Sequence, residues 1–367
     1  MKIGIYARGL SEKVGGPKEY IKLMCESIID TIPKEDQLFI FHNLKERYFK
    51  TKKINVKEIM IKSKNKIICD FIIAPRIINK YNLDVVWFPK NVIPFFIKTK
   101  KIVSILDLGY FLPELNAYPL LDTKYMKFMV RTSCERADKI IAISQNTKKD
   151  IVNLLKINPN KIDVVYLAAG SKYKVIKDKK NLDMVKKKYN LSKKFILFTG
   201  TISPRKNLVR LINAFNKISE GIPHELIITG SKTWKDKEVT SLIENNKKVR
   251  RIGLVDDEDM PALYNLADIY IYPSLYEGFG LPILEAQACG CPVITSNTSS
   301  IPEVAGDGAF FVDPYREDDI SSAILQVIKN KNLRQNLIKK GYKNIKRFSW
   351  EETAQKILNI FRSVYND

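Results

Sequence analysis

Residues 268–297, DIYIYPSLYEGFGLPILEAQACGCPVITSN, decide the fold. Two short apolar runs, 268–274 and 291–297, flank a glycine-rich turn, and Gly280 followed by Pro282 marks a helix start between them. Both runs are continuously apolar rather than alternating, which is typical of strands buried on both faces of a parallel sheet. The stretch therefore predicts two parallel strands joined by a helix.

The same rhythm extends over the whole chain. A periodic segment such as 206–218, with apolar residues at 208, 211, 212, 215 and 218, predicts a helix with one buried stripe. Strands alternating with helices, twice over, predict two doubly wound α/β domains. The lysine-dense segment 170–183 has no apolar period and is expected to join them. The expected strands are 2–7, 37–43, 84–89, 101–107, 139–144 and 161–167, then 194–200, 225–230, 249–253, 268–274, 291–297 and 308–313.

The amino-acid composition limits which classes of function the protein can have. The 62 basic and 40 acidic residues give a net charge of +22, which favours an anionic partner such as nucleic acid, an anionic membrane surface or a phosphorylated ligand. The basic residues are scattered and no nucleic-acid motif is present, so no specific nucleic acid is expected.

No apolar run of membrane-spanning length and no signal peptide is found, which favours a cytoplasmic protein. Five cysteines and two histidines suit neither a disulfide framework nor a zinc site.

Ligands of open α/β sheets bind beyond the carboxyl ends of the strands. There, Arg205 and Lys206 follow a strand that ends at Gly200, and they stand where the next helix should begin. Cations are disfavoured in the first turn of a helix. A bound anion such as a diphosphate would explain why two cations stand there. The alternative is chance placement in a lysine-rich chain.

Two glutamates surround the glycine-rich turn. Gly278 and Gly280 allow a ligand to approach the backbone, and the carboxylates of Glu277 and Glu285 can each accept from a pair of sugar hydroxyls. The alternative for Glu285 is an ordinary acidic residue in the first turn of a helix. The Gly15-Gly16 loop after the first strand is a weaker signal and lacks the glycine pattern of a dinucleotide site.

Together these residues resemble the retaining glycosyltransferases of family 4. The resemblance is most specific in GTISPRKNL (200–208), in residues 251–286 and in residues 291–314. It implies the GT-B fold: two Rossmann-like, doubly wound parallel-sheet domains that face each other across a cleft. The implied domains are an acceptor-binding domain, 1–172, and a nucleotide-sugar-binding domain, 173–348. The final helix, 349–367, which opens with a Ser349/Glu352 capping box, would pack back on the first domain.

The resemblance also implies roles. Arg205 and Lys206 would neutralise the donor diphosphate, Glu285 would bind the ribose, and Glu277 would hold the transferred hexose. The implied donor is a GDP- or UDP-sugar, with GDP-mannose favoured, and neither a metal nor another cofactor is implied. The implied catalytic residues are Arg205, Lys206, Glu277 and Asp107, and the implied donor-binding residues are Gly15, Gly16, Gly200, Thr201, Gly278, Phe279, Gly280, Leu281 and Glu285.

One position departs from the family pattern. The family has His-Asp after the fourth strand, whereas this chain has Leu106 before Asp107. The departure leaves open a catalytically impaired subunit that binds a nucleotide sugar or a partner. The acceptor is expected to be a glycan or a lipid-linked glycan. The basic segment 44–66 and the mixed apolar and basic segment 90–101 suit either peripheral attachment to an anionic membrane surface or ordinary solvation.

Overall fold

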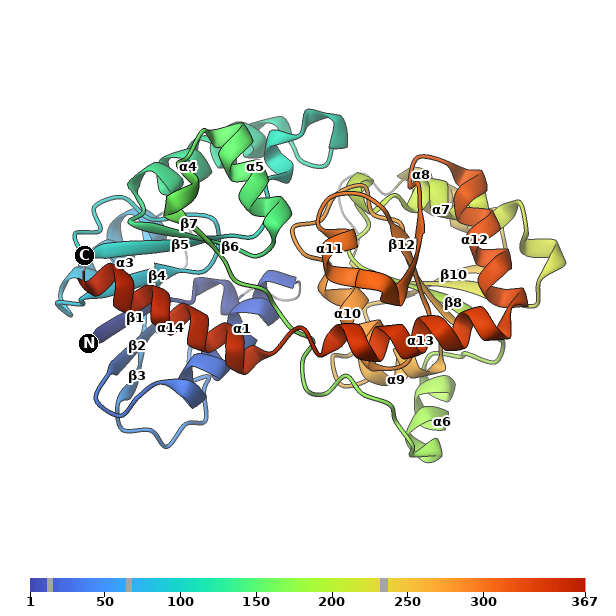
Figure 1. Cartoon of the computed structure of the whole chain (residues 1–367), viewed down its shortest axis with the longest axis horizontal. Coiled ribbons are helices and arrows are strands. Elements are labelled where there is room, and N and C mark those ends of the chain that lie inside the picture. The colour runs from blue at the N-terminus through green and yellow to red at the C-terminus, as the bar shows by residue number, and fades with distance from the viewer. Residues whose placement is uncertain (12–15, 64–67, 232–236, 367) are drawn as a thin grey trace. The chain divides into compact units, whose positions relative to one another are not determined.

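The computed structural model describes residues 1–11, 16–63, 68–231 and 237–366. The chain divides into two compact units, and Figure 1 colours the chain from its N-terminus to its C-terminus. Unit 1 comprises Met1–Phe111, Tyr118–Leu167 and Ser349–Asp367, and unit 2 comprises Leu112–Ala117 and Ala168–Phe348.

Unit 1 contains a parallel sheet. Within the described residues the sheet is 7-stranded, in the order β3-β2-β1-β4-β5-β6-β7. Its centre is apolar on both faces, because successive residues of β1 and β4 are all buried apart from Lys2. The strands are β1 (Lys2–Tyr6), β2 (Gln37–His42), β3 (Val56–Met60), β4 (Val85–Phe88), β5 (Lys100–Ile105), β6 (Lys139–Ala142) and β7 (Ile162–Val164).

The helices of unit 1 include the last helix of the chain. This helix, α14 (Trp350–Asn366), packs against α1 and places Phe361 with its ring centroid 6.0 Å from that of Trp87. The Ser349 hydroxyl accepts from the Glu352 amide at 3.4 Å, as expected for the predicted cap. The other helices are α1 (Gly16–Thr31), η2 (Cys69–Ile73), α3 (Ala74–Asn79), α4 (Leu120–Arg136) and α5 (Gln145–Leu155), with short turns η1 (Arg8–Ser11), η3 (Gly109–Phe111) and η5 (Pro159–Lys161).

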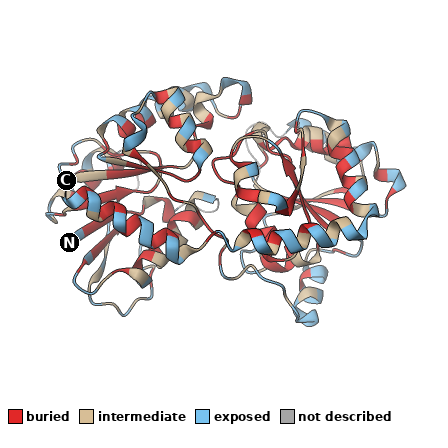
Figure 2. Cartoon of the chain, viewed as in Figure 1, coloured by how far each residue is buried: buried red, intermediate tan, exposed pale blue. Residues whose placement is uncertain are grey.

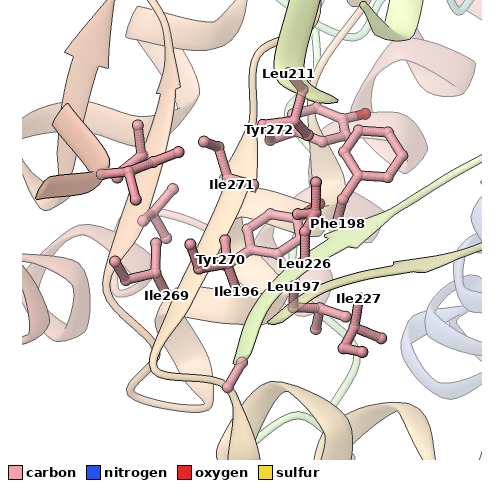
Figure 3. Packing of buried hydrophobic residues seen from close by; sticks show 14 of the residues in the cluster. Ile196, Leu197, Phe198, Leu211, Leu226, Ile227, Ile269, Tyr270, Ile271 and Tyr272 are labelled. Atoms are coloured by element: carbon pink, nitrogen blue, oxygen red, sulfur yellow. The ribbon is translucent and has the colours of Figure 1, made fainter. Parts of the chain in front are cut away.

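Unit 2 contains a second parallel sheet. Over the described part of the chain it is 6-stranded, in the order β10-β9-β8-β11-β12-β13. Figure 3 shows Phe198 of β8 and Tyr272 of β11 side by side, with ring centroids 6.3 Å apart. The strands are β8 (Phe195–Thr199), β9 (Glu225–Thr229), β10 (Val249–Gly253), β11 (Ile269–Tyr272), β12 (Val293–Ser296) and β13 (Ala309–Val312).

The helices of unit 2 cover this sheet, and most of them are buried mainly on one side, as the red and pale blue stripes of Figure 2 show. In α7, Leu208, Leu211, Ile212 and Phe215 form the predicted stripe, although the helix ends before Ile218. The helices are α6 (Lys179–Lys188), α7 (Leu208–Asn216), α8 (Lys237–Glu244), α9 (Met260–Leu266), α10 (Leu281–Ala288), α11 (Ile301–Ala305), α12 (Glu317–Lys329) and α13 (Lys331–Ile345), with turns η4 (Pro113–Leu115), η6 (Pro204–Lys206), η7 (Ser219–Gly221) and η8 (Gly306–Gly308).

The predicted fold class, two Rossmann-like parallel-sheet units, is confirmed, and the structure adds two elements that were not among the expected ones. The basic segment 44–66 contains strand β3, whose side chains are only partly buried because it lies at the sheet edge. The segment 170–183 runs into helix α6, which buries Val185. Among the described residues, no helix is both long and apolar enough to cross a membrane.

Candidate active site

The sheet order of unit 2 defines where a ligand can bind. Strands β8 and β11 are neighbours, and the chain proceeds outward from them in opposite directions, to β9 and to β12. Ligands of open α/β sheets bind at such a reversal, beyond the carboxyl ends of the strands. The segments that follow these two ends are 200–207 and 273–280, which contain most of the predicted donor-binding residues.

The turn after β8 places its two cations in front of α7 rather than within it. Arg205 and Lys206 belong to the short turn η6, and the residue after it, Asn207, has the left-handed conformation (φ 61°). The side-chain amide of Asn207 donates through Nδ2 to the carbonyl oxygens of Pro273 at 3.0 Å and Pro314 at 2.6 Å. Asn207 therefore fastens the turn to the end of β11, a role that the sequence analysis did not assign.

Both cations contact Glu277. The Lys206 ammonium lies 2.6 Å from one Glu277 oxygen, and the Arg205 guanidinium lies 2.8 Å from the other. Lys206 also donates to the Tyr272 hydroxyl and lies 4.4 Å from the centroid of that ring. These contacts order the three predicted residues into one cluster, and their three charges sum to one positive charge.

The electrostatics of this cluster keep Glu277 ionised. Glu277 is only 7% exposed, and Lys206 is buried to a similar extent. Burial by itself raises the pKa of the Glu277 carboxyl, but the charges of Arg205 and Lys206 outweigh this effect and lower that pKa to about 2. At neutral pH Glu277 can therefore accept hydrogen bonds, but it cannot donate a proton.

The glycine-rich turn is held by two serines of the segment after β12. The Ser299 hydroxyl accepts from the Glu277 amide at 3.0 Å, and the Ser300 hydroxyl donates to the carbonyl oxygens of Glu277 and Phe279 at 2.8 and 2.9 Å. Gly280 precedes α10 with φ 106°, a conformation that favours glycine. Gly278 and Leu281 complete the turn, and Pro282 is the second helical residue rather than the first.

Glu285 lies inside α10 and is positioned by a buried network. The Tyr264 hydroxyl donates to a Glu285 oxygen at 2.9 Å. The Thr199 hydroxyl lies 3.2 Å from that of Tyr264 and 3.0 Å from that of Tyr270. Burial, and then the charge of Glu285, raise the pKa of Tyr264 well above its usual value, so the tyrosine stays protonated and orients the carboxylate. Sequence reasoning missed Tyr264, Tyr270 and Thr199.

Gly200 and Thr201 line the end of β8. Gly200 has φ 140°, and a Cβ atom added at the neighbouring Gly230 would overlap the Gly200 carbonyl oxygen. The backbones of the two loops therefore approach so closely that Gly230 has to be glycine. Thr201 is exposed, and its hydroxyl accepts from Ser231 at 3.4 Å.

The remaining predicted residues belong to unit 1. Gly15 lies outside the described residues, and Gly16 is exposed at the first position of α1. Asp107 accepts from the Gly109 amide at 3.0 Å and so caps the turn after β5. Leu106 is half-buried, and its amide donates to the Asn91 side chain at 2.7 Å.

The two histidines are engaged elsewhere. His42 lies 3.0 Å from Glu58, and His224 lies 3.0 Å from Asp268. Both contacts hold loops or strand ends, so neither histidine replaces the one that is missing at position 106. Among the described residues, no group of three or more His, Cys, Asp and Glu side chains is arranged to hold a metal ion.

Comparison with known proteins identifies the family. The family described as "Glycosyl transferases group 1" matches residues 179–344, which lie within unit 2. The chain is 34% identical over 270 residues to the O-antigen chain mannosyltransferase B of Escherichia coli, covering 72% of this chain and 70% of that protein. It is 28% identical over 261 residues to the serotype-specific mannosyltransferase WbdA of Escherichia coli, covering 68% of this chain but only 32% of WbdA.

Solved structures share the fold. The sucrose-phosphate synthase of Thermosynechococcus elongatus superposes with a TM-score of 0.79 at 15% identity, covering 100% of this chain and 99% of that one. HepE of Anabaena, in complex with UDP and glucose, superposes with a TM-score of 0.75 at 17% identity, covering 99% of this chain and 100% of that one. The fold is thus GT-B, and the chain belongs to the group 1 glycosyl transferases.

Proposed function

We propose that this glycosyltransferase moves a hexose, with mannose favoured, from a nucleoside-diphosphate sugar to a glycan or lipid-linked glycan with retention of the anomeric configuration. The observation that carries the proposal is the Arg205–Glu277–Lys206 cluster at the reversal of the unit 2 sheet. Relatives that are described as mannosyltransferases support mannose, and GDP-mannose is the favoured donor over a UDP-sugar.

The cations would act on the leaving group. Transfer breaks the bond between the sugar and the diphosphate, so negative charge grows on the departing phosphate oxygen. Arg205 and Lys206, held in place by Glu277, would meet that charge without rearranging. Because Glu277 stays ionised, it would serve as an acceptor for sugar hydroxyls while the departing phosphate takes the proton of the acceptor hydroxyl.

Other residues would position the donor. The Tyr264 hydroxyl fixes the carboxylate of Glu285, which would accept from the ribose hydroxyls. The backbone of residues 278–281, fixed by Ser300, would lie along the sugar and phosphates. Since the positive charge of the cluster comes from side chains, no metal ion is needed in this scheme.

The proposal is tested first by binding. Thermal stability is measured against GDP, UDP, ADP and their sugar conjugates, with pyrophosphate as a control polyanion. A specific ligand at about 100 times its dissociation constant stabilises by about 2.7 kcal/mol. We expect one nucleotide to exceed the others, and Glu285→Gln to remove that excess while the pyrophosphate response remains. Equal shifts with every anion would contradict a nucleotide-sugar site.

The alternative is a catalytically impaired subunit, which Leu106 motivates. It predicts nucleotide-sugar binding without turnover. Release of the nucleoside diphosphate in the presence of glycan acceptors separates the two functions, and the anomeric configuration of the product, read by NMR, tests retention. Leu106→His is the matched variant, because it restores the residue of the family pattern. A large gain of turnover in this variant would favour the alternative.

A further inference from the structure

Arg251 of strand β10 makes only part of the hydrogen bonds that its side chain can make. The Nη2 nitrogen donates to the carbonyl oxygen of Gly230 at 3.2 Å. The Nε nitrogen is buried, and it has no hydrogen-bond partner among the described residues. An unpaired buried donor costs free energy, and most buried polar groups in proteins are paired. A ligand that offers acceptors to this guanidinium would remove that cost.

The neighbouring arginine of the same strand is engaged differently. Successive residues of a strand point to opposite faces of the sheet, so Arg250 lies on the other face from Arg251. Its Nη1 nitrogen donates to the Glu225 carboxylate at 2.8 Å and to the Asn190 carbonyl oxygen at 3.0 Å, and its Nη2 nitrogen donates to the Tyr189 carbonyl oxygen at 3.4 Å. Structural contacts therefore account for Arg250 but only in part for Arg251.

The guanidinium of Arg251 lies beside the loops of the candidate active site. Gly230 follows β9, and a Cβ atom added there would overlap the carbonyl oxygen of Gly200 at the end of β8. The Ile202 amide donates to the Ser231 carbonyl oxygen at 2.9 Å, which joins the same two loops a second time. Through Gly230, Arg251 is thus connected to the predicted donor-binding residue Gly200.

The order of the strands indicates which part of a nucleotide sugar would reach Arg251. The relevant strands lie in the order β10-β9-β8-β11. Glu277, which is proposed to hold the hexose, follows β11, whereas Glu285, which is proposed to bind the ribose, is linked through Tyr264 to Thr199 at the end of β8. A donor that runs from hexose to ribose would therefore run from β11 toward β8. The base follows the ribose and would continue over β9 and β10.

We propose that Arg251 determines the specificity for the nucleobase of the donor and selects guanine. A guanidinium carries only donors, and guanine presents two adjacent acceptors, O6 and N7, which match it. Adenine places a donating amino group beside its N7, and uracil offers a single carbonyl oxygen on the corresponding edge. Guanine would thus supply the acceptors that the protein does not offer to Arg251.

The inference rests on the proposed function, because it concerns the base of the same nucleotide-sugar donor. The two are tested by different quantities. Binding of any nucleoside diphosphate tests the proposed function, whereas the ratio of affinities for different bases tests the role of Arg251.

The first experiment compares nucleotides by calorimetry on the full chain. We expect the wild type to bind GDP at least about tenfold more tightly than UDP or ADP. Arg251→Gln should bring the ratio of the GDP and UDP affinities close to one. Arg251→Lys should do the same, because an ammonium can hold the Gly230 carbonyl oxygen but cannot make the bidentate pair. Circular dichroism of each variant establishes that it is folded.

The matched control is Arg250→Gln. It removes an arginine from the same strand but from the opposite face of the sheet, where the guanidinium contacts Glu225. This variant should keep the preference of the wild type for GDP.

The second experiment identifies the atoms of the base that are recognised. Inosine diphosphate keeps O6 and N7 and lacks only the 2-amino group, so it should bind as GDP does. The 7-deaza analogue of GDP lacks N7 and should bind the wild type about three- to tenfold more weakly. Arg251→Gln should bind GDP and its 7-deaza analogue equally. A residue that only held the Gly230 loop would not make binding depend on N7.

The outcomes separate the inference from the proposed function. Equal weakening of GDP, UDP and ADP binding by Arg251→Gln would show that Arg251 only holds the loop, and this would overturn the inference. A wild type that binds UDP or ADP as tightly as GDP would also overturn it, while a nucleotide-sugar site would stand. Failure of the wild type to bind any nucleoside diphosphate would contradict the proposed function and the inference together.

Discussion

Glu277→Gln gives the sharpest test of the ion cluster in unit 2. The substitution keeps the size of the side chain but leaves the half-buried Arg205 and the buried Lys206 beside a neutral amide. The pKa of Glu277 is lowered from 4.5 to about 2, and at about 1.4 kcal/mol per pH unit this gap corresponds to about 3 kcal/mol of stability. Breaking a buried ion pair by removing one partner costs a similar amount, about 3–5 kcal/mol.

The pH dependence of the free energy of unfolding tests whether the ionised form of Glu277 is responsible for this stability. Because the folded pKa lies below the unfolded value, the contribution of Glu277 is fully present above about pH 4.5 and is lost as the pH falls toward 2. The free energy of unfolding of unit 2 is measured by urea-dependent hydrogen exchange in β8 and β11 at a series of pH values. The difference between the wild type and Glu277→Gln should be about 3 kcal/mol at pH 7 and should shrink in acid.

The matched control is Glu317→Gln in the same unit. Glu317 pairs with Lys217 at 3.1 Å on a more exposed part of the surface, where such pairs contribute less than about 1 kcal/mol. If Glu277→Gln is no more destabilising than Glu317→Gln at neutral pH, the reasoning from burial and charge is refuted.

Three further predictions concern the same unit. Lys206→Ala should lower kcat/KM by about 100- to 1,000-fold in a donor-transfer assay, and an unchanged rate would remove Lys206 from the catalytic machinery. Tyr264→Phe should weaken nucleotide binding by about three- to tenfold in calorimetry while kcat changes little, because it loses one hydrogen bond to Glu285; a loss confined to kcat would count against a positioning role. Gly230→Ala should destabilise by roughly 3 kcal/mol or more in urea unfolding, whereas Gly221→Ala, where an added Cβ meets no neighbour within 4 Å, should be nearly neutral.

Sequence patterns predicted the central strands well because these are buried on both faces. The segments 194–200 and 268–274 are apolar with few polar residues, so the pattern of a buried strand is clear in both. Strands β8 and β11 lie within these segments. Strand β3 escaped prediction because an edge strand is only half-buried, and here the adjacent Lys57 and Glu58 interrupt its apolar residues. Glu58, within that basic segment, accepts from the Tyr48 amide and contacts His42, which no pattern of spacing would reveal.

The candidate site was predictable only in part. The glycine-rich turn and the adjacent cations indicated which loops matter, and the structure brings Arg205, Lys206 and Glu277 into contact. Their support could not be read from the sequence, because it comes from residues distant along the chain. Tyr264 meets Thr199 across two segments 65 positions apart, and Asn207 reaches Pro314.

The position of α14 has a consequence for the order in which the protein is made. Unit 1 contains the first residues of the chain, yet its helix α14 is translated after the whole of unit 2. Phe361 and its apolar neighbours fill the space beside Trp87, so an emerging unit 1 exposes that surface until the ribosome has added the last helix. Unit 2, in contrast, is a continuous run apart from residues 112–117 and can complete its core first. The nascent chain thus finishes folding its first half last, and during that interval chaperones would find their binding surface on unit 1.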